Sequence, residues 1–473
     1  METYLFVPRS LGLDRHSYPR DQFYADAQAY IRFKTPSVPL PALADPDNAD
    51  SPLQRARRLI VAANGAGEID PDRMRRELRL LGCLVRANLR DAAADIRAKV
   101  DRLDDPGEHR VLAEDVRQAI GRLLRDVSAI LSSFRDLRPD FLQTKRPAWL
   151  RELFEYVDEY LSISAESYLT AVLSRLDAHA ALRDALSDTR QAVTQTIVDE
   201  QGHRQGAGYV SVLDPDGENR HYIYRKGALK KFMSSVLFLE IHKEREGRGI
   251  SNVVAGIAAA VAMLFSTIAA IWSQGAYGLN SFPFVLAIVI SYVFKDRIKE
   301  WLRTYFSGLM SRWLYDYSVL IHDPVAGIVG RCRESFGYVT DSNLPTEIKR
   351  LRHCDSSSVL EAESKPEGVM KYVKDVTLRS RQIARAHGRL GDVNDIIRLN
   401  ISSFLGRMDE PQQTVATYSE ELDAVTAVTC PKAYHVNLVM VLKAEGKKAA
   451  IDRFRIIMDK QGIRDLQVVE LSA

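Results

Sequence analysis

The chain has 473 residues and carries 65 Lys and Arg against 62 Asp and Glu, a formal net charge of +3. Its length exceeds that of one ordinary domain, so we expect two or three folded units besides any membrane segment. The near balance of charge argues against a nucleic-acid-binding protein, because such proteins show a basic excess.

The four cysteines, Cys83, Cys332, Cys354 and Cys430, are far apart and form no Cys-x-x-Cys pair. This spacing favours a reducing compartment and indicates neither a disulfide framework nor a zinc ribbon. The N-terminal residues carry charges early and contain no long apolar run, so we expect no cleavable signal peptide.

Residues 1 to 66 mix short β-forming runs with proline-rich loops, as in TYLFVP and AYIRFKTPSVPL. A lone strand is unstable, so we expect these strands to pair with strands from later in the chain. Residues 67 to 205 repeat a helical pattern four times, broken at Asp105-Pro106-Gly107 and at Arg138-Pro139. This pattern predicts a four-helix bundle or a coiled-coil stalk that projects as an insertion.

Residues 206 to 250 are predicted to form a β-hairpin followed by a juxtamembrane helix. The runs YVSVL at 209 to 213 and HYIYR at 221 to 225 alternate, and the Asp, Gly and Asn between them favour a turn. The segment that follows, residues 227 to 246, has apolar residues at helical spacing.

Residues 249 to 294 contain no Asp, Glu, Lys, Arg or His. We predict a transmembrane hairpin over residues 251 to 294, with spans at 252 to 273 and 277 to 294. At about 1.5 Å per residue these spans are about 33 and 27 Å long, against a hydrocarbon core of about 30 Å. The alternative is two buried helices of a soluble core, which is less favoured because such helices usually keep a polar stripe.

The residues around the two spans predict their orientation and packing. Basic residues flank both spans, which predicts cytoplasmic N- and C-termini and contact with anionic lipid: Lys230, Lys231, Lys243, Arg245, Arg248, Lys295, Arg297, Lys299 and Arg303. Trp272 and Tyr277 are expected at the far interface, and Tyr292 and Trp301 at the near one. The small residues Gly256, Ala260, Ser266 and Ala270 have the spacing of a close helix contact, either between the two spans or with another copy.

Residues 295 to 320 are predicted to continue as an amphipathic juxtamembrane helix, and residues 321 to 473 to form an α+β domain. The strands of this domain are expected within residues 326 to 339, 368 to 384, 424 to 444 and 465 to 471, and its helices at 393 to 408 and 447 to 461. The predicted fold is therefore a multi-domain membrane protein. It joins the hairpin to a cytosolic helical region and to a cytosolic α+β domain assembled from both ends of the chain.

The sequence lacks the common catalytic motifs of phosphate-binding loops, hydrolase elbows and zinc proteases, and it indicates no metal site and no cofactor. Glu200 and His203 have the spacing of metal ligands, but a di-iron site needs two such pairs, so we interpret them as a frayed helix end. We interpret the acidic run from Asp214 to Asn219 as a hairpin turn rather than a calcium loop. His435 is expected to be a hydrogen-bonded core residue. A solvated helix face accounts for a run of basic residues: Arg73, Arg75, Arg76, Arg79, Arg86 and Arg90.

These features favour a two-pass, bacterial-type inner-membrane protein that acts as a scaffold, sensor or effector through contacts with cytosolic proteins, with self-association as a further expectation. Two alternatives stay open. One is a membrane-tethered enzyme of unfamiliar type that acts on a nucleotide or a lipid headgroup, and the catalytic residues of such an enzyme are not indicated. The other is an oligomeric effector that perturbs the membrane.

Overall fold

The structure of the chain is a computed structural model. It describes residues 1–64, 69–102, 109–143, 146–179, 183, 185–214, 217–245, 248–277, 281–310, 315–353, 367–388, 390–420 and 423–470. The fold contains both helices and strands, as the sequence predicts. The chain divides into two compact units. The sheet unit comprises Met1–Ile31, Leu239–Ala386 and Asp395–Ala473, and the helical unit comprises Arg32–Phe238 and His387–Asn394.

The sheet unit is built on one antiparallel sheet of eight strands, in the order β12-β11-β10-β1-β6-β5-β4-β3. β1 (Glu2–Pro8) lies between β10 (Tyr434–Leu442) and β6 (Glu367–Leu378), with Tyr4 opposite Val439 on one side and Lys371 on the other. The first strand of the chain is therefore held by two strands that come much later. The remaining strands are β3 (Glu240–Arg245), β4 (Tyr317–Asp323), β5 (Gly327–Val339), β11 (Ala450–Asp459) and β12 (Gly462–Val468).

Apolar side chains alternate along β1, so that both faces of the sheet carry a core. Phe23 of α1 (Arg20–Asp26) stacks on Phe336 of β5 with ring centres 3.9 Å apart, and both belong to one core cluster with residues of α16 (Ser402–Leu405). Tyr4 and Phe6 belong to a second cluster with Ile348 of α13 (Thr346–His353).

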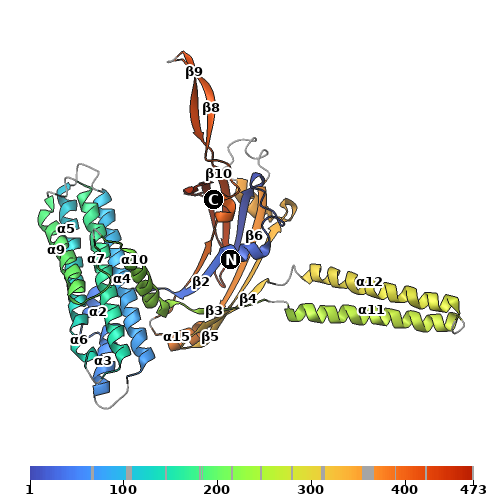
Figure 1. Cartoon of the computed structure of the whole chain (residues 1–473), viewed down its shortest axis with the longest axis horizontal. Helices are drawn as coiled ribbons and strands as arrows, with labels where there is room; N and C mark the ends of the chain where they lie inside the picture. Colours follow the sequence, from blue (N-terminus) through green and yellow to red (C-terminus); the bar gives the residue numbers. More distant parts are fainter. Residues whose placement is uncertain are drawn as a thin grey trace. The chain divides into compact units, whose positions relative to one another are not determined.

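The helical unit is organised around four long helices, α4 (Pro71–Asp101), α5 (His109–Arg135), α7 (Ala148–Asp177) and α9 (Ser187–Gly206), which pack on one another (Figure 1). These are the four helices that the sequence predicts. Asp70 caps α4 by accepting hydrogen bonds from the backbone amides of Asp72 and Arg73. The unit also contains α2 (Leu40–Ala44), α3 (Pro52–Asn64), α6 (Arg138–Phe141) and α10 (Arg220–Ser234).

The predicted β-hairpin at residues 209 to 225 is wrong, because α10 begins at Arg220 and residues 209 to 214 form no strand. Tyr222, Leu229 and Met233 lie on the buried face of α10, and Arg225 bonds to Glu159 of α7. Packing against α7 therefore decides the structure of a run whose local alternation favours a strand. The predicted helix over residues 227 to 246 ends at Ser234 and gives way to β3.

In the C-terminal part, two predicted helices are strands. Residues 447 to 461 contain β11, which pairs with β10 from Ala450 to Met458. Residues 393 to 408 contain β7 (Val393–Leu399), which pairs with β2 (Ala27–Phe33), and then α16. The predicted strand at 424 to 444 is divided into β9 (Ala424–Pro431) and β10, and β8 (Gln412–Ser419) pairs with β9 in a separate ribbon. The predicted strand at 368 to 384 ends at Leu378, where β6 ends, and α15 (Ser380–Ala386) follows.

Between β3 and β4 the chain forms two long helices, α11 (Arg248–Ala276) and α12 (Phe282–Met310), which lie side by side (Figure 1). α12 ends at Met310 and β4 begins at Tyr317, so the end of the predicted juxtamembrane helix at 295 to 320 is strand. Because β3 and β4 are paired, the two helices form an excursion from one edge of the sheet.

Candidate functional site

The contact between α11 and α12 is made by small side chains. Ala258 and Ala262, one turn apart on α11, are 0% and 1% exposed, and Ser291 of α12 is 7% exposed. The hydroxyl groups of Ser291 and Ser266 are 3.4 Å apart. Small residues at every fourth position let two helix backbones approach closely, so the hairpin is held by a narrow Ala and Ser seam.

The outer faces of both helices are apolar and exposed. In the most apolar part of the candidate membrane span Ala255–Ala276, only 11% of the residues are buried. The large exposed aliphatic and aromatic side chains include Ile257, Val261, Leu264, Phe265 and Ile268 on α11, and Val285, Leu286, Val289 and Val293 on α12. An apolar surface of this kind marks an interface with lipid or protein.

Within the described residues, Ala255–Ala276 is the one helix long and apolar enough to cross a membrane, with a mean hydropathy of 2.0. The second predicted span, 277 to 294, is not supported. α12 begins at Phe282, and Pro283 has no backbone N–H, which suits the first turn of a helix. The charge-free part of α12 therefore runs only from Phe282 to Phe294, about 20 Å, which is less than a bilayer core of about 30 Å.

The predicted packing residues are only partly in the seam: Ser266 faces it and Ala270 is half-buried, whereas Gly256 and Ala260 are exposed. Among the aromatic residues predicted at the membrane interfaces, the rings of Trp272 and Tyr277 pack edge to face with their centres 6.3 Å apart. Tyr292 and Trp301 are exposed. The Lys295 amine lies 3.8 Å from the centre of the Tyr292 ring.

The predicted basic residues fall on several different elements. On α12, Arg297, Lys299 and Arg303 are exposed. Lys230 and Lys231 are exposed on α10 of the helical unit, Lys243 and Arg245 are in β3 rather than in a helix, and Arg248 is the first residue of α11.

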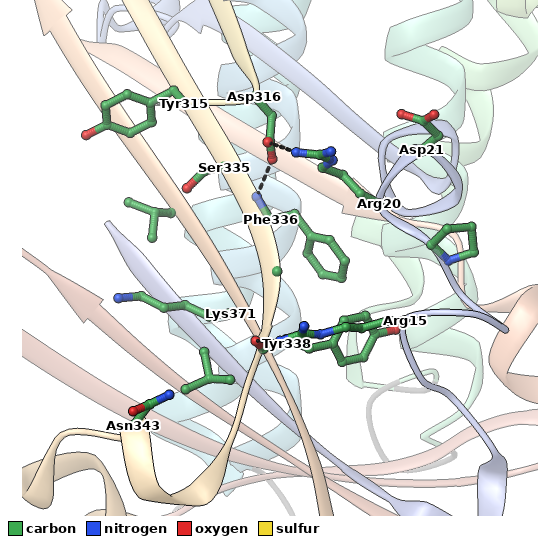
Figure 2. Close-up of a pocket in the computed structure, with 14 residues that line it drawn as sticks. Arg15, Arg20, Asp21, Tyr315, Asp316, Ser335, Phe336, Tyr338, Asn343 and Lys371 are labelled. Carbon is green, nitrogen blue, oxygen red and sulfur yellow. Dashed lines mark hydrogen bonds and ion pairs between the residues drawn. The ribbon is translucent and has the colours of Figure 1, made fainter. Parts of the chain in front are cut away.

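A groove of about 1250 Å³ lies in the sheet unit where β5 extends beyond β4 (Figure 2). β4 pairs with β5 only as far as Glu334, so in the described part of the chain no strand lies beside residues 335 to 339 on that side. Side chains occupy part of this edge. The Asp316 carboxylate accepts a hydrogen bond from the Phe336 amide at 2.7 Å, and the Arg15 guanidinium donates to the Tyr338 carbonyl at 3.1 Å.

The ionisable groups that line this groove are already paired. Asp316 binds the Arg20 guanidinium and accepts a hydrogen bond from the Tyr24 hydroxyl at 3.0 Å, and burial together with this carboxylate raises the pKa of Tyr24. Lys371 lies 3.1 Å from the Glu2 carboxylate. These pairs hold the charged side chains along the groove in fixed contacts.

Buried carboxylates of α7 form ion pairs with α5, α9 and α10. The Asp158 carboxylate accepts hydrogen bonds from Arg135 of α5 at 3.0 Å and from His203 of α9 at 2.8 Å. The Glu200 carboxylate of α9 accepts a hydrogen bond from the same Arg135 at 2.7 Å. The interpretation of Glu200 and His203 as a frayed helix end is therefore wrong, because α9 continues to Gly206 and both residues bond across the bundle. Sequence analysis could not predict these hydrogen bonds, because the partners of Glu200 and His203 lie on helices far away in sequence.

Further pairs extend this cluster along α7. Arg204 binds the Glu166 carboxylate and donates to the Ser162 hydroxyl at 2.8 Å, and Arg225 binds Glu159 at 2.6 Å. Arg204 and Glu159 are almost completely buried. Each acidic group of the cluster has a basic partner, so the cluster holds the bundle together and presents no free charge.

Burial alone would raise the pKa values of Asp158 and Glu200. For Asp158, the hydrogen bond from His203 and the Arg135 charge outweigh burial and lower the pKa below its ordinary range. For Glu200, the hydrogen bonds and the charge of Arg135 lower the pKa in the same way. Both carboxylates are therefore ionised at neutral pH and act as fixed acceptors.

Two smaller expectations also have an outcome. His435 is exposed rather than a core residue. Of the basic run on α4, Arg73 and Arg90 are exposed, but the Arg79 guanidinium lies 4.1 Å from the centre of the Phe232 ring, so this helix face is only partly solvated.

Over the parts of the chain that are described, no group of three or more His, Cys, Asp or Glu side chains could hold a metal ion. No protein-family model matches the chain, and neither the curated proteins nor the solved structures searched contain a match. The fold and these surfaces are therefore the basis for any functional proposal.

Proposed function

We propose that the chain is an integral membrane protein of the inner membrane, held in the bilayer by α11 and α12, which acts as a scaffold through protein contacts. The observation that carries the proposal is the arrangement of the hairpin, with small residues in the seam and large aliphatic side chains outside. Exposed apolar area costs about 25 cal/mol per Å² in water, whereas in lipid it is favourable and each helix satisfies its own backbone.

The connections of the hairpin support an arrangement in which the rest of the chain stays on one side of the bilayer. The chain enters α11 from β3 and leaves α12 towards β4, and these strands are paired, with Ile241 opposite Ile321. Basic residues follow the apolar part of α12, which supports a cytoplasmic position for this end and contact with anionic lipid. Both termini are then cytoplasmic.

The register of the two helices bears on the depth of insertion. Ser291 lies beside Ser266, so Lys295, one turn further along α12, is level with Ala262, one turn back along antiparallel α11. The part of the hairpin free of charge on both helices is therefore about 20 Å long. A segment shorter than the bilayer core is accommodated by local thinning and by long basic side chains that reach the headgroups, which is the role we assign to Lys295, Arg297 and Lys299.

Vesicle flotation tests the membrane part of the proposal. The full-length chain is expected to float with vesicles that contain anionic lipid and to remain bound after an alkaline carbonate wash. The variant Ile268→Arg/Val289→Arg places charge on the outer faces of α11 and α12 near the middle of the charge-free part, where the change from an aliphatic residue to Arg costs about 3 to 4 kcal/mol each at the centre of a bilayer. This variant is expected to lose flotation.

The matched control is Val61→Arg/Val210→Arg, which places the same two charges on exposed positions of the helical unit. This control is expected to float like the unmodified chain. Release of the unmodified chain by carbonate, or equal flotation of the Ile268→Arg/Val289→Arg variant, would show that the hairpin is not the membrane anchor.

A further inference from the structure

The ribbon of β8 and β9 has a cross-strand ladder in which like residues face one another. Thr414 lies opposite Thr429, Val415 opposite Val428, Ala416 opposite Ala427 and Thr417 opposite Thr426. Read in opposite directions, the two strands therefore present the same series of side chains. The edge formed by β8 is chemically similar to the edge formed by β9.

The ribbon is exposed on both faces. Val415, Tyr418, Val425 and Val428 are 45%, 57%, 72% and 46% exposed. Within the described residues each strand pairs only with the other, so the ribbon also has two open edges. An isolated two-stranded ribbon is marginally stable in water, and an open strand edge is a template for another strand.

The outer strands of the eight-stranded sheet carry charge and the ribbon does not. β3 and β12, the outer strands of the eight-stranded sheet, have the sequences EIHKER and GIRDLQV. β8 and β9, QQTVATYS and AVTAVTCP, contain no Asp, Glu, Lys or Arg. Charged side chains on an edge prevent the pairing of copies, so this protection is present on the main sheet and absent from the ribbon.

We propose that the ribbon is a self-association surface, in which β9 of one copy pairs edge to edge with β8 of a second copy. The antiparallel ladder between copies then repeats the ladder within each copy, with Val428 opposite Val415 of the neighbour. A second copy is the occupant that the ladder favours, because its edge carries the same Thr, Val and Ala series and no like charges meet. A charged partner strand would find no opposite charge on the ribbon.

This pairing has a consequence for the form of the assembly. β8 of the first copy and β9 of the last copy stay open, so the contact is head to tail and does not close by itself. The assembly is therefore expected to grow with concentration rather than to stop at a dimer. The proposal does not depend on the membrane role of α11 and α12.

Light scattering of the full-length chain in detergent, over a series of concentrations, gives the first measurement. The unmodified chain is expected to increase in mass with concentration. Val415→Lys/Val428→Lys and Val415→Glu/Val428→Glu each place like charges opposite one another within each copy and also at the proposed contact between copies, and each is expected to weaken association about tenfold. The like charges within each copy remain in a mixture of the two variants, so recovery of association in the mixture assigns the loss to the contact between copies. An equimolar mixture of the two variants restores opposite charges at the contact and is expected to recover association.

The control is Leu466→Lys/Val468→Lys, which places two lysines on exposed positions of β12 and is expected to associate like the unmodified chain. Hydrogen exchange of the unmodified chain supplies a second readout that needs no variant. The backbone amides of residues 412 to 431 are expected to become more protected as concentration rises.

Three results would overturn the proposal. The unmodified chain could stay monomeric at every concentration, the lysine variant could associate as strongly as the unmodified chain, or the mass could rise without added protection in residues 412 to 431. The last result would assign association to another surface, such as the outer faces of α11 and α12.

Discussion

Replacement of Arg204 by Leu should destabilise the helical unit more than any exposed Arg replacement there. Arg204 is 1% exposed, and its loss leaves the Glu166 carboxylate with the Gln201 amide at 2.6 Å and leaves the Ser211 carbonyl without the Arg204 donor at 3.1 Å. Removing one partner of a buried ion pair costs about 3 to 5 kcal/mol, because the remaining charge stays buried. That is a large fraction of a total stability of about 5 to 15 kcal/mol.

Two further variants separate the buried charge from the loss of a large side chain. Arg204→Leu/Glu166→Leu removes both charges and is expected to recover much of the stability, because an apolar pair can replace a buried ion pair. Arg190→Leu breaks the exposed pair with Asp177 in the same unit and is expected to have little effect.

The free energy of opening of α7 and α9, measured by hydrogen exchange on the full-length chain, reports all three variants. A loss in Arg204→Leu no larger than that in Arg190→Leu would refute the reasoning. So would a double variant that is no more stable than Arg204→Leu alone.

Three other predictions follow from the same contacts. Asp158 and Glu200 have lowered pKa values in the folded chain, so the unfolded state binds protons first as pH falls; the helical unit should lose stability as pH falls below their ordinary values of 3.8 and 4.5, as measured by circular dichroism. Burial raises the pKa values of Cys83 and Cys332 to about 12, so a maleimide should modify the exposed Cys430 and leave these two unmodified in the native chain, as read by peptide mass spectrometry. Asp316→Ala removes the acceptor of the Phe336 amide, which should then exchange its hydrogen faster, and unchanged exchange would contradict the role given to this carboxylate.

The four long helices could be predicted from sequence because each carries its pattern over many turns, as Leu78, Leu89 and Val100 do on α4. β11 could not. Its sequence AIDRFRIIMD fits both a helical and a strand pattern, and pairing with β10 decides between them. The prediction of a strand at residues 221 to 225, where the structure has α10, was wrong for a related reason. The contact of Arg225 with Glu159, far away in sequence, overrides the local alternation.

The hairpin seam shows a different limit. α11 contains small residues at four-residue spacing in more than one frame, both Gly256 with Ala260 and Ala258 with Ala262. Spacing alone cannot choose between them, because the choice depends on the rotation of α11 against α12, and the second frame is the buried one. The groove beside β5 was beyond sequence analysis altogether, because Arg15, Asp316, Tyr338 and Lys371 meet only through the order of strands in the sheet.

The chain is 27% charged, yet two of its surfaces, the apolar part of the hairpin and the ribbon, carry no charge. The hydrogen bonding of the backbone decides which environment each surface can enter. In α11 and α12 the backbone groups bond within each helix, so the helices can enter lipid. The ribbon has two open edges, and unpaired N–H and C=O groups cost several kcal/mol each in hydrocarbon, so it suits water and another strand instead. Two threonine pairs within its ladder, Thr414 with Thr429 and Thr417 with Thr426, fit the same environment. Under the two proposals the uncharged surfaces have different partners, lipid for the hairpin and a neighbouring copy for the ribbon, and loss of one should leave the other intact.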